Sequence, residues 1–155
     1  MTTLHRQVDT RLAIDEAFAF IADFSNSMLW DPGTVTSEPV DSGPTSVGSR
    51  YRLGVRMGSR VVPMEYRITL FEAPTRVVLE GSGSNVEAVD EIRFSPSATG
   101  THIDYTADIR LGGAMRLVQP FLGRAFAKLA QDAVDGMRRV LDERAAAQDS
   151  TSARS

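Results

Sequence analysis

The amino-acid sequence predicts an α+β fold in which one antiparallel β-sheet is covered by a long C-terminal helix. Apolar and polar residues alternate in successive segments between residues 50 and 110, which is the pattern of strands with one buried face. Apolar residues then recur every three or four positions from Leu122 to Val140, as in an amphipathic helix. With 155 residues, 42% of them hydrophobic, the chain is long enough for one domain with its own core.

The composition argues against several kinds of function. The chain has no cysteine, so disulfides, thiolate metal ligands and cysteine nucleophiles are excluded. Its net charge of −3 argues against nonspecific nucleic-acid binding. No window approaches the roughly 18 apolar residues of a membrane span, and the opening MTTLHRQVDT lacks the apolar stretch of a secretory signal. We therefore expect a cytoplasmic protein with no membrane span, no nucleic-acid partner, no metal and no cofactor.

The N-terminal third predicts a strand, a short helix and a turn-rich connection. Residues 4–12 alternate between a mixed face and a polar face, which indicates a strand. Asp15 can cap the following helix, whose apolar residues keep helical spacing as far as Phe24. The stretch FSNSMLWDPG ends this helix, because Ser and Asn favour turns and Pro32 disfavours a helical conformation before it. Residues 33–48 are rich in Gly, Pro, Ser and Thr and predict a loop with one short strand.

Five further strands are expected, separated by turns that contain Gly, Pro, Ser or Asn. Regular alternation over successive hairpins is typical of an antiparallel sheet with one covered face. The expected strands are residues 50–57, 62–70, 77–80, 87–94 and 102–110.

The last segment predicts the helix that covers this sheet. Pro120 marks a break or a helix start. Beyond it, the apolar stripe consists of Leu122, Phe126, Leu129, Ala133, Met137 and Val140. We expect a single ligand-binding domain over residues 1–146 and a disordered tail over residues 147–155, which has little to bury.

The element order and four sequence stretches resemble the helix-grip fold of the START and birch-pollen-allergen superfamily (SRPBCC). The stretches are FAFIADFSNSMLWDPG, SVGSRYRL, YRITLFEAPTRVVLEG and GTHIDYTADIRL, and the resemblance covers about residues 2–145. They are most similar to its bacterial polyketide cyclase/dehydrase-like branch. The resemblance implies a curved sheet around the long helix, with an apolar cavity between them. It supports the fold more than any reaction, because such proteins include carriers, sensors, cyclases and chaperone cofactors.

Trp30, the single tryptophan, has two interpretations. In the implied fold it lies near the cavity mouth, where an indole offers a flat apolar wall with one N–H donor. Alternatively, Trp30 plugs the end of the sheet while Asp31 and Pro32 form a turn. Both interpretations stay open for Trp30, and the turn is preferred for Asp31.

Asp90 is the best candidate for a catalytic residue, and the catalytic set is otherwise unknown. It shares the predicted inward face of Ala88, Ile92 and Phe94, so its carboxyl must be hydrogen-bonded, paired or protonated. There it would anchor a ligand or act as a general acid/base. Alternatively, it lies near the strand end in solvent, bonds a structural tyrosine or arginine, or is turned outward by a β-bulge.

The expected ligand-binding site is a sparse polar set in an apolar pocket, in which three inward tyrosines accompany Asp90. For any one tyrosine alone, core filling with its hydroxyl at the sheet rim is the preferred interpretation, and this preference is weaker for all three together. The expected ligand-binding residues are Trp30, Tyr51, Leu53, Met64, Tyr66, Ile68, Asp90, Ile92, Tyr105, Phe126, Leu129 and Ala133.

The remaining charged residues argue against other chemistry. His5 and His102 fall on polar strand faces, so neither a Ser-His-Asp nucleophile system nor a zinc site is expected. The arginines of two adjacent strands accompany Glu65, which predicts a solvated sheet face with cross-strand pairs. These arginines are Arg50, Arg52, Arg56, Arg60 and Arg67.

Three hypotheses for the function follow. The preferred one is binding or carriage of a hydrophobic small molecule, such as a lipid, polyketide or isoprenoid-like compound, by a monomer or homodimer. The second is a cofactor-independent polyketide aromatase/cyclase or dehydratase that uses Asp90 and the tyrosines. The third is a protein-interaction module with a filled core.

Overall fold

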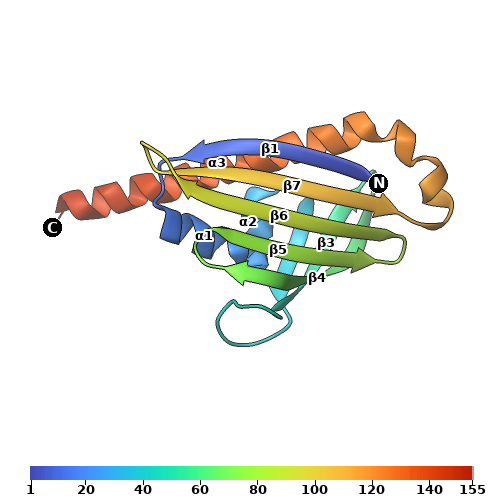
Figure 1. Ribbon diagram of the computed structural model, residues 1–155, viewed down its shortest axis with the longest axis horizontal. Coiled ribbons are helices and arrows are strands. Elements are labelled where there is room, and N and C mark those ends of the chain that lie inside the picture. Colours follow the sequence, from blue (N-terminus) through green and yellow to red (C-terminus); the bar gives the residue numbers. More distant parts are fainter. Residues whose placement is uncertain (155) are drawn as a thin grey trace.

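The computed structural model describes residues 1–154 and has the predicted helix-grip architecture (Figure 1). A sheet and one long helix form its two main parts, and short helices follow the first strand. In chain order the elements are β1 (Thr2–Thr10), α1 (Ile14–Ala22), the 3₁₀ helix η1 (Phe24–Asn26), α2 (Ser27–Trp30), β2 (Thr34–Pro39), β3 (Arg50–Met57), β4 (Arg60–Glu72), β5 (Arg76–Gly83), β6 (Val86–Pro96), β7 (Thr101–Leu111), the 3₁₀ helices η2 (Gly113–Leu117) and η3 (Gln119–Phe121), and α3 (Gly123–Arg154).

The described residues form one antiparallel sheet of seven strands in the order β1-β7-β6-β5-β4-β3-β2. The first two strands of the chain therefore lie at opposite edges, and α1, η1 and α2 connect them across one face. Register shifts between Thr34 and Thr36 and between Ile68 and Leu70 interrupt the ladders, and such bulges bend strands. Figure 1 shows α3 running behind the sheet along β1 and β7.

The inner face of the sheet packs against the helices as the alternation predicts. On β6, alternate side chains from Ala88 to Phe94 are buried. At one end of the sheet, Phe18 of α1 packs edge-on against Phe71 and Phe94, with ring centroids 5.3 and 5.2 Å away. These contacts place α1 against this end of the inner face.

A glycine allows α3 to pass close to the stretch that contains Trp30. Gly136 is buried in α3, and a Cβ at this position would collide with the backbone carbonyl oxygen of Trp30. The ring of Pro32 also lies within van der Waals distance of that position. The Trp-Asp-Pro turn is therefore pressed against the long helix, which fixes where the indole points.

Two details of the helices differ from the sequence predictions. The prediction that Asp15 caps the first helix was wrong, because α1 begins at Ile14 with Ala13 at its N-cap and Asp15 lies in its first turn. The negative charge of Asp15 is still favourable at a helix N-terminus. Helix α3 continues as far as Arg154, through most of the segment expected to be a disordered tail; Ser155 lies outside the described residues. Within residues 1–154, each helix is too short or too polar to cross a lipid bilayer.

Candidate functional site

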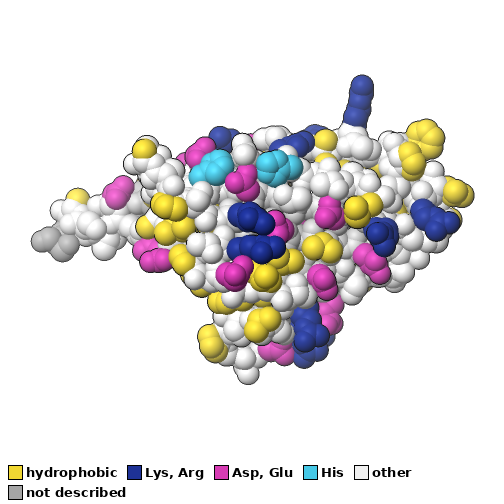
Figure 2. Space-filling view, viewed as in Figure 1, with side chains coloured by type: hydrophobic (Ala, Val, Ile, Leu, Met, Phe, Trp, Pro, Cys, Tyr) yellow, Lys and Arg dark blue, Asp and Glu magenta, His cyan; other side chains and the backbone are white. Residues whose placement is uncertain are grey.

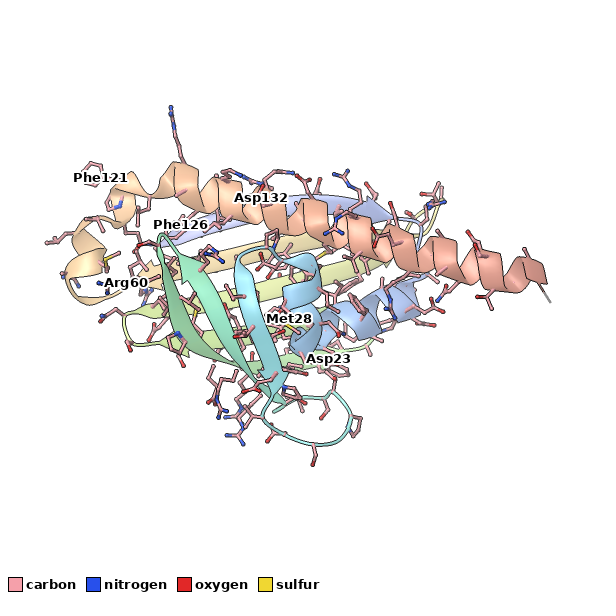
Figure 3. The ribbon with its side chains drawn as sticks, turned by 180° about the vertical axis from the view of Figure 1, so that it is seen from behind. Asp23, Met28, Arg60, Phe121, Phe126 and Asp132 are labelled. Carbon is pink, nitrogen blue, oxygen red and sulfur yellow. The ribbon has the colours of Figure 1, made fainter. Side chains whose placement is uncertain are left out.

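A cavity of about 140 Å³ lies between the inner face of the sheet, α2 and the N-terminal half of α3. Its wall includes two exposed side chains, Arg56 at the end of β3 and Leu129 of α3, so the cavity opens between these two elements. Figure 3 shows Phe126, another wall residue, beside the tip of the β3–β4 hairpin. The opening thus lies at the end of the molecule opposite α1.

The size of the cavity limits what it holds without rearrangement. An apolar cavity of about 150 Å³ is known to hold one benzene molecule. Pockets for drug-sized ligands span about 300–1,000 Å³. The cavity as it stands therefore fits one aromatic ring or a short branched chain, and a ligand with several fused rings requires α3 or the β3–β4 hairpin to move outward.

Trp30 is both a core residue and a wall of the cavity. It is 2% exposed, and its ring packs edge-on against Phe24 and Tyr105, with centroid distances of 6.1 and 6.2 Å. Within residues 1–154, its Nε1 is the one buried side-chain nitrogen or oxygen without a hydrogen-bond partner. An unpaired buried donor costs about 1–3 kcal/mol. The two sequence interpretations are thus compatible, but the indole lies on the inner wall and not at the mouth.

Asp90 is a buried carboxyl on the same wall. It lies in the middle of β6 and is 6% exposed, so the alternatives of a solvated strand end and an outward-turning bulge do not apply. Burial raises its pKa to about 7, the negative charge of Asp31 acts in the same direction, and a hydrogen bond with Tyr105 acts against both. Near neutral pH the carboxyl is therefore divided between its acid and carboxylate forms.

The two tyrosines beside Asp90 remain protonated. Burial and the neighbouring Asp90 raise the pKa of both Tyr66 and Tyr105 well above the ordinary value of 10.0. The Tyr66 ring lies over Gly81 of the adjacent strand, where a Cβ would come within 2.6 Å of ring atoms. A glycine at this position leaves space for the ring and sets its position in the wall.

Asp31 combines the turn role preferred from the sequence with a place on the cavity wall. Its Oδ1 accepts a hydrogen bond from the Gly33 backbone N–H at 2.8 Å, and its Oδ2 accepts one from the Thr34 hydroxyl at 3.1 Å. Burial raises its pKa, and those two hydrogen bonds lower it. The cavity wall therefore contains two carboxyls, and the charge of Asp31 raises the pKa of Asp90.

Sequence reasoning missed Arg6 as a wall residue. Its side chain donates to the backbone carbonyls of His5 at 2.8 Å and Ala127 at 3.4 Å. The signal was present in the alternation of the first strand, which places Arg6 on the same face as Leu4 and Val8. Arg56 was missed for another reason, because alternation places it outward and only its position at the strand end brings it to the opening.

The structure brings nine of the twelve expected ligand-binding residues to the cavity wall. They are Trp30, Leu53, Met64, Tyr66, Asp90, Tyr105, Phe126, Leu129 and Ala133. Tyr51, Ile68 and Ile92 lie elsewhere in the packed core. The inner face of the sheet extends beyond the cavity wall, and the ring of Tyr51 packs against Phe24 with a centroid distance of 6.4 Å.

Both histidines lie on the outer face of the sheet, as the alternation predicts (Figure 2). Asp104 connects them, at 3.1 Å from His5 and 3.4 Å from His102, and His102 also contacts Asp9 at 2.8 Å. No histidine of the described chain therefore reaches Asp90. Within residues 1–154, no three histidine, aspartate or glutamate side chains are arranged to hold a metal ion.

A seven-stranded sheet that grips a long helix, with an apolar cavity and a few buried polar groups between them, defines the helix-grip fold. Residues 1–142 match the family described as polyketide cyclase / dehydrase and lipid transport, and the chain belongs to this family. No curated protein sequence matches the chain.

Solved structures with the same fold show how widely it is used. The Zhui aromatase/cyclase from Streptomyces sp. R1128 is 15% identical, with 93% of this chain and 95% of that chain covered and a TM-score of 0.77. A START superfamily protein from Mycobacterium smegmatis is 13% identical, with 92% and 95% covered and a TM-score of 0.69. A conserved protein from Geobacillus kaustophilus is 17% identical, with 92% and 96% covered and a TM-score of 0.69. At these identities the likeness establishes the fold alone.

Proposed function

We propose that the protein binds a compact hydrophobic molecule that carries a carbonyl or hydroxyl oxygen. The observation that carries this proposal is that Trp30 lines a mostly apolar cavity while its buried N–H has no hydrogen-bond partner. An acceptor oxygen on the ligand would satisfy this donor after a small shift of the indole, and Asp90 or Tyr105 would bond a second polar atom. The cavity volume favours a ligand with one ring or a short branched chain.

Calorimetric titration with acetophenone and ethylbenzene tests this proposal. The two molecules have similar shapes, but only acetophenone carries an acceptor oxygen. We expect acetophenone to bind more tightly to the wild-type protein, and Trp30→Phe to remove most of this preference. The loss should be about tenfold in Kd, because one satisfied buried donor is worth about 1–3 kcal/mol. If the protein binds neither molecule, nor any other compact aromatic, the proposal is wrong.

A second function, dehydration or cyclisation of a polyketide-like ligand, is favoured by the acid-base properties of Asp90. A group with a pKa of about 7 in a buried site both accepts and returns a proton efficiently near neutral pH. For a β-hydroxy ketone, the Asp90 carboxylate would take the proton from the carbon next to the carbonyl. The same proton would then be given to the departing hydroxyl, which leaves as water and creates a conjugated enone.

The two functions are separated by Asp90→Asn. If the protein is a dehydratase, this variant still binds acetophenone but no longer forms enone from 4-hydroxy-4-phenylbutan-2-one, which is followed by ultraviolet absorbance. If the wild-type protein forms no enone while it binds acetophenone, binding alone is the function. Equal enone formation by wild type and variant would remove Asp90 from the mechanism.

A further inference from the structure

Exposed apolar side chains gather with arginines on the segment that comprises η2, η3 and the first turn of α3. We call this surface the end patch; it consists of Met115, Arg116, Leu117, Val118, Phe121 and Arg124. Phe121 is 84% exposed and Leu117 is 76% exposed, the two highest values among its apolar members. Figure 2 shows hydrophobic side chains with basic ones beside them at this end of the molecule, and Figure 3 shows Phe121 pointing away from the body.

The charge around the end patch is opposite to that of the whole chain. The chain has a net charge of −3, yet residues 109–131 contain no Asp or Glu, and neither do residues 54–63 of the β3–β4 hairpin. Lys128 pairs with Asp132 at 2.8 Å, whereas Arg116 and Arg124 have no acidic side chain within 4.0 Å among the described residues. Figure 3 places Arg60 of the hairpin at the same end as Phe121. This end therefore presents unpaired positive charge.

Protruding aromatic and aliphatic side chains beside arginines match the chemistry of an anionic bilayer. The apolar side chains would enter the acyl boundary while the guanidinium groups remain with the lipid phosphates. Basic residues near an anionic membrane surface each add to binding, and the negative remainder of the chain would turn this end toward the membrane. Phe121 points away from the body and Leu117 is also strongly exposed, which favours insertion over capture of a partner's helix.

We propose that the end patch docks the protein on anionic lipid bilayers. The cavity opens between β3 and α3 at the same end, next to the patch. If the cavity binds a hydrophobic molecule as proposed above, docking would let that molecule pass between bilayer and cavity with little exposure to water. The docking itself does not depend on that function, because it is carried by surface residues that lie outside the cavity wall.

Vesicle co-sedimentation of the full chain tests the proposal. We expect binding to vesicles of phosphatidylcholine and phosphatidylserine in equal parts, weaker binding at high salt, and little binding to pure phosphatidylcholine. Phe121→Ser should weaken binding about tenfold or more, because it removes one inserted aromatic ring. Val47→Ser is the matched control: Val47 is 63% exposed in the loop before β3, and its replacement should leave binding unchanged.

A charge-matched pair of variants tests the electrostatic part. Arg116→Gln/Arg124→Gln and Arg138→Gln/Arg139→Gln remove the same charge, but Arg138 and Arg139 lie farther along α3 and pair with acids of their own helix. We expect only the first variant to lose binding to anionic vesicles. Thermal melts of all variants should match wild type, because every changed side chain is exposed.

Three results would overturn the proposal. The first is that the wild-type chain does not bind anionic vesicles. The second is that the end-patch variants and the control variants bind equally well. The third is concentration-dependent self-association, measured by sedimentation velocity, that Phe121→Ser abolishes without affecting vesicle binding. Acetophenone binding in solution is measured without vesicles, so failure of docking and failure of the proposed ligand binding are distinguishable.

Discussion

Replacement of Asp90 by Asn should stabilise the protein at neutral and alkaline pH. The native pKa of about 7 lies above the ordinary value of 3.8, so the native state holds a proton that the unfolded chain releases. The stability of the wild type should therefore fall as the pH rises from about 4 to about 7. At pH well above 7, the difference between the two pKa values corresponds to about 4 kcal/mol. Asn keeps the shape of the protonated acid and never ionises, so the variant avoids this loss.

Urea unfolding of both proteins at about pH 4 and about pH 8 measures the effect. With a urea dependence of about 2 kcal/mol per molar, the Asp90→Asn midpoint should rise by up to about 2 M at the higher pH and change little at the lower. Asp104→Asn is a control of opposite sign, since hydrogen bonds from Gln7 and His5 lower the pKa of Asp104 and contribute stability that is lost as the pH falls. That loss should stay below about 1 kcal/mol because Asp104 is near the surface.

The reasoning would be refuted if Asp90→Asn were no more stable than wild type at about pH 8. It would also be refuted if the gain were equal at both pH values, because a shape effect, unlike ionisation, does not depend on pH. Either result would mean that the carboxyl is solvated or paired in solution.

Three further predictions concern the frame that holds the cavity. Gly136→Ala should lower the free energy of unfolding in urea by about 1–3 kcal/mol, because the added Cβ would meet the Trp30 carbonyl oxygen. Gly123→Ala is the control and should be neutral or stabilising, because open space surrounds that position. Equal effects of the two changes would contradict the close approach of α3. Asp142→Ala should lower the free energy of unfolding by about 1–3 kcal/mol, because Asp142 accepts hydrogen bonds from the Thr10 hydroxyl at 2.7 Å and the Arg11 N–H at 3.0 Å. Asp149→Ala is the exposed control, and equal losses from both changes would refute the role of Asp142. Removal of residues 147–155 should change the free energy of unfolding by less than about 1 kcal/mol. Residues 147–153 are exposed, and the surface contact of Gln148 with Glu16 contributes little. A larger loss would show that the tail belongs to the domain.

The sequence predicts the sheet well because alternation reports directly which side chains face the core. Asp90 was placed on the inward face by its neighbours Ala88 and Ile92, and the structure confirms that face. Alternation predicts which face of the sheet a side chain lies on, but it does not predict which part of that face borders the cavity. Tyr51 and Ile68 therefore face inward as predicted yet lie away from the cavity, and the ring of Tyr51 packs against Phe24.

The close approach of α3 to the Trp-Asp-Pro turn could not be predicted from local patterns. Gly136 interrupts an otherwise ordinary helix, and helix propensity alone counts it as a weak point. Only the packing of α3 on α2 shows that a side chain there would meet Trp30. Asp31 is a similar case, since its turn chemistry was visible in the sequence and its place on the cavity wall follows from tertiary packing.

The resonance of the Trp30 indole N–H in isotope-labelled protein is the most direct test of the proposed binding site. The chain has one tryptophan, so a single indole signal reports the unpaired N–H of this cavity-lining residue. We predict that titration with acetophenone moves this signal to lower field in a saturable manner, as expected when the N–H gains an acceptor, and that ethylbenzene causes a smaller displacement without this direction. A signal that remains in place up to the solubility limit of acetophenone, or moves identically with both molecules, would contradict the account.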